Sequence, residues 1–418
     1  MSSSLGPLQD GGRVVIIGGG PGGVACALAL QRQARQLGRR ITVTILEGKQ
    51  FSSEQHYNQC AGVLSPPLPA LLKHELGLPF PYHLSRGEIK GYVLHTDGEV
   101  LLLPERGEPS IAVRRIQFDA FMLEAATQAH IGIIPARAVD VEFHADGVMV
   151  YTENVPLECD VVVGAFGLDE GSAAFFARST GYHPPRFLDS VVTKYHPGVE
   201  AMEAFGPYIH AFLPADPAIE FGAITPKGNH LTINIAGRRV DAPTMRAFLA
   251  NPLVQATLPN LDRAGLYDVN DLHIFKGRFP RSLASHFYGD RYVMIGDAAG
   301  LVRAFKGKGV TSAVLTGIRA ARTILEEGIS ASAFADHYRR ANRDIIEDLP
   351  YGQLMRHLTI NLARLRLLDP VLRAARADGV LQDALFDAVS AHGPYKAVLG
   401  RSLRPHVVAH VVREMLSM

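Results

Sequence analysis

Three glycines near the N-terminus stand at a spacing that allows a backbone to approach phosphate groups closely. Gly18, Gly20 and Gly23 form a G-x-G-x-x-G pattern, and Pro21 and Gly22 complete the turn. A pyrophosphate held there would face the free N–H groups and the positive dipole end of a helix. Glycines also occur in purely structural turns, so the flanking segments decide the interpretation.

The elements that must position these glycines stand on both sides of them. Residues 14–17 form an apolar run typical of a buried strand, and residues 24–30 continue as an apolar helix. Residues 41–46 predict a second strand, which ends at Glu47 and Gly48. An acidic side chain at this spacing binds the hydroxyls of a ribose. The sequence therefore predicts a unit that binds a dinucleotide, although Glu47 could also be a solvated strand end.

Composition excludes several classes of function. The chain has 418 residues, of which 47% are hydrophobic, and a formal net charge of +1. This length predicts two or three structural units, and the balanced charge argues against a nucleic-acid partner. The three cysteines and the histidines show no metal-binding spacing, so we expect no metal site and a reducing, cytoplasmic location.

The ends and apolar runs of the chain bear on targeting. Residues 1–7 lack the charged and apolar regions of a signal peptide. No run reaches the ~18 to 20 apolar residues of a membrane span. Any membrane contact is therefore expected to be peripheral.

Further along the chain, strands and helices alternate. We expect a helix over 69–76, a hairpin of 87–96 and 99–103, a helix over 120–129, a hairpin of 139–143 and 148–151, and a buried strand over 160–164. From 184 to 279 the pattern predicts a second, mostly antiparallel sheet, with strands over 190–195, 219–225 and 230–235. Residues 291–295 and 310–325 return to the first unit as a strand and a helix, and residues from 330 onward are helical.

Four motifs in this order resemble the FAD-dependent oxidoreductases of the aromatic-hydroxylase fold, and within them the geranylgeranyl reductase family. They are the N-terminal glycine motif, Arg115-x-x-Phe118-Asp119, Gly164-Ala165-Phe166-Gly167, and Gly296-Asp297-Ala298-Ala299-Gly300. The resemblance implies that Asp297 holds the ribityl chain of FAD, a role that suits a carboxylate facing hydroxyl donors. It also implies that the motif glycines and Arg115 lie at the cofactor.

Two further stretches match that family. Cys60 and Gly62 begin a segment similar to the one near the flavin's reactive face, and the stretch 208–214 looks like a Y-x-W-x-F-x-P motif with His210 in place of tryptophan. Gly307-Lys308-Gly309-Val310 resembles the family's G-E-G-I, which implies that Gly307, Gly309 and Val310 lie at the pyrimidine edge of the flavin.

The fold implied is α/β: a Rossmann-like FAD-binding domain (GR2-type, p-hydroxybenzoate hydroxylase-like), an inserted mostly antiparallel β substrate domain and a C-terminal helical region. We expect the FAD-binding domain to comprise 10–80, 108–183 and 286–330, the substrate domain 81–107 and 184–285, and the helical region 331–418.

Three residues are candidates for acid–base chemistry. A thiol with a pKa near ~8.5 keeps its proton at neutral pH, so Cys60 could donate one, although many buried cysteines are inert. Tyr208 and His210 lie two apart and would share one face of a strand. That face either lines a substrate cavity or carries satisfied polar core residues.

The sequence also departs from the family. Phe166 stands where relatives often have an acid, and Arg303 and Lys308 replace residues common beside the flavin edge. Both cations either favour negative charge on the reduced flavin or are ordinary surface charges. The chain has no tryptophan, which removes the W-x-W-x-I-P signature expected of flavin-dependent halogenases.

The leading functional hypothesis is an FAD-dependent reductase of carbon–carbon double bonds in a prenyl or similarly apolar small molecule. A monooxygenase acting on an aromatic or polyketide-like substrate is the alternative. A third is a flavoprotein electron carrier or lipid binder without turnover. The reductant is either NAD(P)H, bound transiently, or a protein electron donor.

Overall fold

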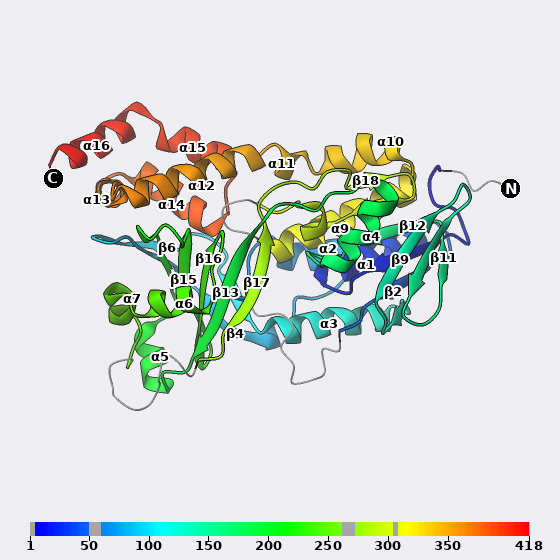
Figure 1. Ribbon diagram of the computed structural model, residues 1–418, viewed down its shortest axis with the longest axis horizontal. Helices are drawn as coiled ribbons and strands as arrows, with labels where there is room; N and C mark the ends of the chain where they lie inside the picture. Colours follow the sequence, from blue (N-terminus) through cyan, green and yellow to red (C-terminus); the bar gives the residue numbers. More distant parts are fainter. Residues whose placement is uncertain (1–4, 50–59, 261–271, 304–307, 418) are drawn as a thin grey trace.

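The computed structural model describes residues 5–49, 60–260, 272–303 and 308–417. Figure 1 shows an elongated molecule with one sheet toward each end. Helices from the C-terminal part of the chain run along one side and join the two ends. The predicted α/β class with a helical C-terminal region is confirmed.

The sheet nearer the N-terminus has the strand order β18-β19-β12-β1-β2-β8. Its strands are β1 (Arg13–Ile17), β2 (Thr42–Leu46), β8 (Gly132–Ile134), β12 (Val161–Gly164), β18 (Tyr288–Gly289) and β19 (Tyr292–Met294). Neighbours from β19 to β8 pair in parallel. The chain leaves β1 for β2 on one side and returns to β12 on the other, which opens a crevice at the carboxyl ends of these strands.

Helices and a small sheet flank these strands. The helices are α1 (Pro21–Gln36), α2 (Leu68–Leu76), α3 (Arg115–Gln128), α4 (Glu170–Thr180), α8 (Gly296–Ala299) and α9 (Gly309–Glu326). The small antiparallel sheet consists of β9 (Ala138–Phe143), β10 (Val148–Thr152) and β11 (Leu157–Cys159). Helix α3 begins at Arg115, five residues before the predicted start at 120, because Phe118 and Asp119 are buried on its first turns.

Helices α1 and α9 pack at very short range through glycine. A Cβ added to Gly317 would lie 2.5 Å from the carbonyl oxygen of Gly22. No side chain fits that gap without moving one helix from the other. Both helices begin at the crevice, so their separation also sets its shape.

We expect Gly317→Ala to destabilise the protein by about 1–3 kcal/mol, the range for overpacking a tight core. The matched control is Gly400→Ala, because a Cβ at this helical glycine meets open space. That change should be neutral or stabilising, since alanine is the better helix former. Denaturant unfolding of both variants checks the difference, and equal stabilities would contradict the packing argument.

The second sheet has the order β17-β13-β16-β15-β14-β5-β6. Its strands are β5 (Gly91–His95), β6 (Val100–Pro104), β13 (Phe187–Tyr195), β14 (Ile209–Phe212), β15 (Phe221–Lys227), β16 (His230–Gly237) and β17 (Phe275–Pro280). All neighbours pair antiparallel except β14 and β5. One face packs on α5 (Val199–Phe205), α6 (Ala242–Leu249) and α7 (Pro252–Thr257).

The strand predicted over 87–96 is two strands in two sheets. β4 (Ser85–Ile89), preceded by the short helix η1 (Tyr82–Leu84), pairs with β7 (Ser110–Val113), which also pairs with β3 (Val63–Leu64). β5 instead forms the hairpin with β6. The break falls at Gly91, whose φ of 140° favours glycine, and a Cβ there would lie 2.3 Å from the Leu103 carbonyl oxygen.

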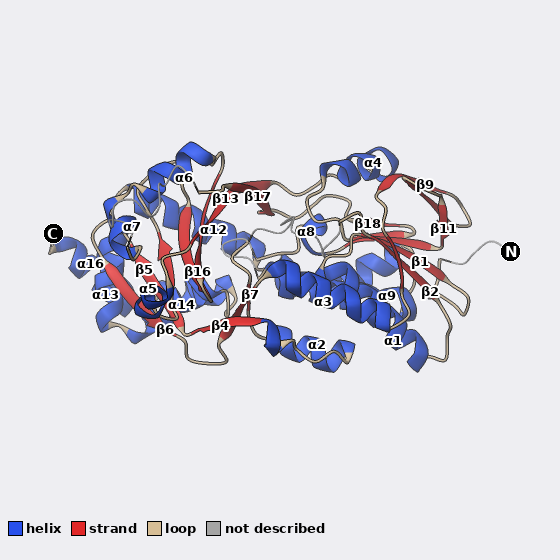
Figure 2. Cartoon of the chain, turned by 90° about the horizontal axis from the view of Figure 1, so that it is seen from below, coloured by secondary structure: helices blue, strands red, loops and turns tan. Residues whose placement is uncertain are grey.

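The C-terminal region packs on both ends of the molecule. It comprises α10 (Ala331–Ala333), η3 (Phe334–Arg339), α11 (Arg343–Ile346), α12 (Leu349–Arg364), α13 (Leu368–Ala377), α14 (Gly379–Ser390), α15 (Tyr395–Ser402) and α16 (Pro405–Leu416). Apolar residues of α13, α14 and α16 cover the β5–β6 end of the second sheet, on the face opposite α6. In Figure 2 these helices lie beside that sheet. Within the part of the chain described, no helix is both long and apolar enough to cross a membrane.

Candidate cofactor site

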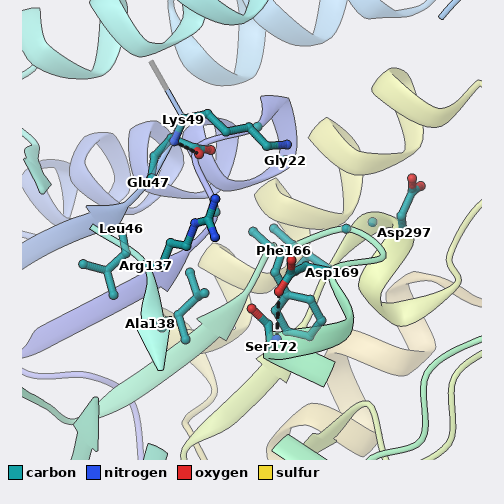
Figure 3. Close-up of a pocket in the computed structure, with 18 of the residues that line it drawn as sticks. Gly22, Leu46, Glu47, Lys49, Arg137, Ala138, Phe166, Asp169, Ser172 and Asp297 are labelled. Carbon is teal, nitrogen blue, oxygen red and sulfur yellow. Dashed lines mark hydrogen bonds between the residues drawn. The ribbon is translucent and has the colours of Figure 1, made fainter. Parts of the chain in front are cut away.

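A cavity of about 780 Å³ opens where β1, β2 and β12 end. It runs from the β2 end, with Glu47 and Arg137, to the start of α8, with Asp297 (Figure 3). Twelve predicted cofactor residues line it: Gly18, Gly20, Pro21, Gly22, Glu47, Gly48, Arg115, Gly167, Gly296, Asp297, Gly309 and Val310. The structure thus brings the segments of all four motifs to one space.

The glycine turn presents bare backbone to this cavity. Gly20 precedes α1 without a capping side chain, and the first turn carries no acid. A Cβ at Gly20 would meet nothing within 4 Å, so the space above the helix start is open. Gly18 has a φ of 111° and lies against the Ala165 carbonyl, and Gly23 packs on the Gly18 carbonyl. Gly23 therefore holds the helix against the strand and does not line the cavity.

Glu47 is fixed at the end of β2 by two backbone donors. Its carboxylate accepts hydrogen bonds from the Gly19 N–H at 2.9 Å and the Lys49 N–H at 2.8 Å. A carboxylate has lone pairs for about four donors, so capacity remains for hydroxyls entering the cavity. Gly48 next to it allows close passage of the Arg137 side chain, which lies 2.7 Å from the position of a Gly48 Cβ.

Asp297 places a carboxylate in the cavity without a hydrogen-bond donor from the described residues. Among the described residues, none donates a hydrogen bond to its side chain. Burial raises its pKa to about 6, against the opposing effect of the nearby Arg115 charge. A desolvated carboxylate with free acceptors facing a cavity suits a ligand that brings hydroxyl donors.

The raised pKa predicts a pH-dependent stability of the ligand-free protein. Because the folded-state pKa of Asp297 lies above its unfolded value, the folded protein binds more protons between about pH 4 and pH 6 and loses stability as pH rises through this window. Asp297→Asn removes that loss. We therefore expect the ligand-free Asn variant to unfold at a higher temperature than the parent at pH 7, with the difference vanishing near pH 4. A difference independent of pH would contradict the assignment.

Arg115 connects the cavity to Cys60. Its guanidinium forms an ion pair with the buried Asp119 at 3.0 Å and reaches the Cys60 Sγ at 3.8 Å. Lys227 donates to the Cys60 carbonyl oxygen at 3.3 Å from the second sheet. Cys60 therefore lies where the Arg115 side of the cavity meets that sheet. A Cβ at the neighbouring Gly62 would strike both the Val113 carbonyl and Lys227, so Gly62 permits this contact without lining the cavity.

Phe166 and Asp169 form the floor between the two ends of the cavity (Figure 3). Phe166 stacks on Phe176 with ring centres 5.6 Å apart. Asp169 accepts a hydrogen bond from the Ser172 N–H at 2.8 Å and so caps α4. The chain thus has a carboxylate at this wall, three residues after Phe166, although Phe166 itself replaces the acid of the motif.

The two unusual cations do not line the cavity. Lys308 donates to the Pro66 carbonyl oxygen at 2.8 Å, and Arg303 donates to the carbonyl oxygens of Ala391 and Gly393 at 2.9 and 2.8 Å. Lys308 ties the start of α9 to the loop before α2, and Arg303 ties the segment after α8 to the loop after α14. Gly307 lies outside the described residues.

Several predicted residues lie near the cavity without lining it. Gly164 makes room for Met294 and Phe166, and Gly300, with a φ of 68°, fits closely against the Ser282 carbonyl. Gly164 allows close packing at the end of β12, and Gly300 allows it at the end of α8.

Tyr208 and His210 are not brought together with Cys60. The register pairs His210 with Ile224, whose side chain packs on the face covered by α5–α7. His210 there forms a 2.8 Å hydrogen bond with His95, and burial lowers the pKa of both rings to about 4. Their predicted catalytic role stays a prediction that no described contact with the cavity supports.

Some lining residues were not found from the sequence. They include Lys49, Arg137, Glu153, Asp169, Ser172 and Ala313. Arg137 and Glu153 belong to the β9–β10 edge, and only the folded chain brings that edge beside Glu47. Within the described ranges, no cluster of three or more His, Cys, Asp or Glu residues is arranged to hold a metal ion.

No family model and no curated protein matches this sequence. Solved structures do match it in fold. A geranylgeranyl bacteriochlorophyll reductase-like protein from Thermoplasma acidophilum is 16% identical over 97% of this chain and 100% of that chain, with a TM-score of 0.69. A flavoprotein/dehydrogenase from Cytophaga hutchinsonii is 17% identical over 98% and 100%, also with a TM-score of 0.69. A mutant of halogenase PltM in complex with FAD is 15% identical over 94% and 85%, with a TM-score of 0.60. The chain has the fold that these proteins share.

Proposed function

We propose that this protein binds FAD in the 780 Å³ cavity and is an oxidoreductase that reduces carbon–carbon double bonds of an apolar substrate. The observation that carries the FAD assignment is the unpartnered carboxylate of Asp297 in the same cavity as the uncapped N-terminus of α1. These two features are complementary to hydroxyls and to a pyrophosphate. Similar folds in a reductase-like protein and in an FAD complex add support.

Each part of the cavity fits one part of that cofactor. Glu47 has acceptors for the ribose hydroxyls, the Gly18–Gly22 turn has N–H groups for the pyrophosphate, and Asp297 has acceptors for the ribityl hydroxyls. The reacting ring would then lie beyond Asp297, toward Arg115 and the start of α9. No side chain of the described residues fills the space above Gly20 or Gly309, as such a ligand requires.

The proposed chemistry adds one hydride and one proton across a double bond. Reduced FAD, when bound, supplies the hydride to one carbon. In this proposal the Cys60 thiol, beside Arg115, would donate a proton to the other carbon and regain one from solvent.

Cys60→Ala tests the proton donor. Loss of a positioned general acid lowers turnover by about 10²- to 10⁴-fold, while FAD affinity should stay unchanged. His210→Asn is the matched comparison, because His210 lies on the far face of the sheet and its loss should leave turnover close to the parent value. Turnover by steady-state assay checks both, and the reverse pattern would move the donor to His210.

An anaerobic reaction tests the function itself. The holoprotein is reduced with dithionite, mixed with geranylgeranyl diphosphate and followed by flavin absorbance and product mass. We expect reoxidation of the flavin with a gain of two hydrogens per double bond. A reduced flavin that persists without oxygen, and that on admission of air reoxidises with oxygen insertion into a substrate, would replace this function by the monooxygenase.

A further inference from the structure

The face of the second sheet opposite α6 carries positive charge without an acidic partner. Lys227, Lys194 and Arg114 lie close enough for their charges to interact, and Lys227 is only 4% exposed. Among the described residues, no carboxylate forms an ion pair with any of the three. Neighbouring Arg115, by contrast, is neutralised by Asp119.

The strand register places polar groups on the same face as these cations. Lys227 pairs with His230, and Thr232 pairs with Lys194 on one side and Thr225 on the other. Residues directly opposite each other in a sheet have Cβ atoms about 4.5–5.5 Å apart and point to the same side. Lys194, Lys227, His230 and Thr232 therefore form one group at the β13–β16–β15 end, defined here as the cation face.

Two buried polar atoms of this face have no partner. His230 is 2% exposed and its Nε2 makes no hydrogen bond within the described part of the chain. Thr232 is 1% exposed and its Oγ1 is equally unsatisfied there. Buried polar atoms are satisfied in nearly all native proteins, so an orphaned pair beside unneutralised cations indicates a missing ligand.

Electrostatics agrees with this geometry. Burial, together with the charges of Lys194, Arg115 and Arg114, lowers the pKa of Lys227 to about 8, against the opposing effect of Cys60. Burial and the charge of Lys227 lower the pKa of His230 to about 3, so its ring is neutral. A bound anion would relieve the repulsion among these groups.

The position of the cation face relates it to the cavity. Lys227 contacts the Cys60 carbonyl, Cys60 contacts Arg115, and Arg115 lines the cavity within electrostatic reach of Asp297. A group held at the cation face would thus lie next to the end of the cavity where the proposed function places the reacting ring.

We propose that the cation face binds a phosphate or carboxylate group of the substrate, with Lys227, Lys194 and Arg114 neutralising its charge and with His230 and Thr232 completing its hydrogen bonds. The proposal rests on the proposed function, which supplies the rest of the substrate. That part is an apolar chain that extends from the anionic group toward the flavin ring. The proposal assigns a charged head group to the substrate and sets its orientation relative to Cys60.

The test compares charged and uncharged probes. Isothermal titration calorimetry measures the affinity of each protein for three probes: inorganic pyrophosphate, geranylgeranyl diphosphate and geranylgeraniol. The proteins are the parent, Lys227→Met, Lys194→Met and Lys276→Met. Lys276 lies on the same sheet, but its register with Val191 puts it on the opposite, α6 face, so its variant is the matched control. If the variant at the buried Lys227 fails to fold, Lys194→Met alone tests the proposal.

We expect Lys276→Met to bind pyrophosphate and geranylgeranyl diphosphate with the same affinity as the parent. Lys227→Met and Lys194→Met should each bind them about tenfold or more weakly, the factor expected from losing one charge-assisted hydrogen bond, with geranylgeraniol unaffected. Equal anion affinity in all four proteins would overturn the proposal.

The outcome is separable from the proposed function. Pyrophosphate binding that depends on Lys227 in a protein that reduces no alkene would keep the anion site and remove the reductase. Reduction of geranylgeranyl diphosphate with the same KM in the parent and in Lys227→Met would keep the reductase and remove the anion site.

Discussion

Asp297→Ala should weaken FAD binding by about 10- to 150-fold. The carboxylate has no hydrogen-bond donor among the described residues, so its acceptors are available to ligand hydroxyls. A hydrogen bond to a charged group contributes about 1.5–3 kcal/mol, and each 1.4 kcal/mol is about tenfold in Kd. Titration of the ligand-free protein with FAD, followed by flavin fluorescence, gives the ratio of the two constants.

The matched control for that experiment is Asp336→Ala. Asp336 is an exposed carboxylate of the C-terminal region, so it removes the same charge away from the cavity. Its FAD affinity should equal that of the parent. Equal affinities for Asp297→Ala and the parent would show that Asp297 does not hold the ribityl chain.

Glu220→Gln should lower the free energy of unfolding by about 3–5 kcal/mol. Glu220, just before β15, forms two hydrogen bonds with Arg356 of α12, one of them 2.7 Å long. The two side chains are only 7% and 4% exposed. Removing one partner of a buried pair leaves the other charge desolvated and unpaired, and this loss has the stated size. The pair joins α12 of the C-terminal region to the second sheet.

Two further variants separate this effect from a general loss of charge. The double variant Glu220→Leu with Arg356→Met removes both charges and should be less destabilised than Glu220→Gln, since no buried charge is orphaned. Asp10→Asn breaks an exposed pair with Arg40 and should leave the denaturant midpoint almost unchanged. A double variant less stable than Glu220→Gln would contradict the argument.

The sequence predicted those parts of the site that depend on neighbours in the chain. The turn from β1 into α1 is encoded within about ten residues, because glycines at fixed spacing follow an apolar strand. Glu47 was found from its spacing after the second strand and Asp297 from the family resemblance of the Gly296–Gly300 motif, and the structure puts both on the cavity that these glycines line. Only their ligand remains a proposal.

What the sequence could not predict depends on register between distant strands. Alternation shows that Tyr208 and His210 share a face, but only pairing with β15 shows that the face is the one opposite Lys227. Likewise, no local pattern connects Lys194 to Thr232, or Arg137 to Gly48. Gly91 ended the strand predicted over 87–96 because its backbone conformation, invisible in an alternating pattern, turns the chain into another sheet.

The most direct test of the account is a titration of the purified, ligand-free protein with FAD, read by the flavin spectrum and by equilibrium dialysis. We expect one FAD bound per chain, a shifted visible spectrum, and competition by ADP, which should occupy the Gly18–Glu47 end of the cavity. An unshifted spectrum and no retained FAD at any concentration, with a folded protein confirmed by circular dichroism, would contradict the central claim that this cavity is a flavin site.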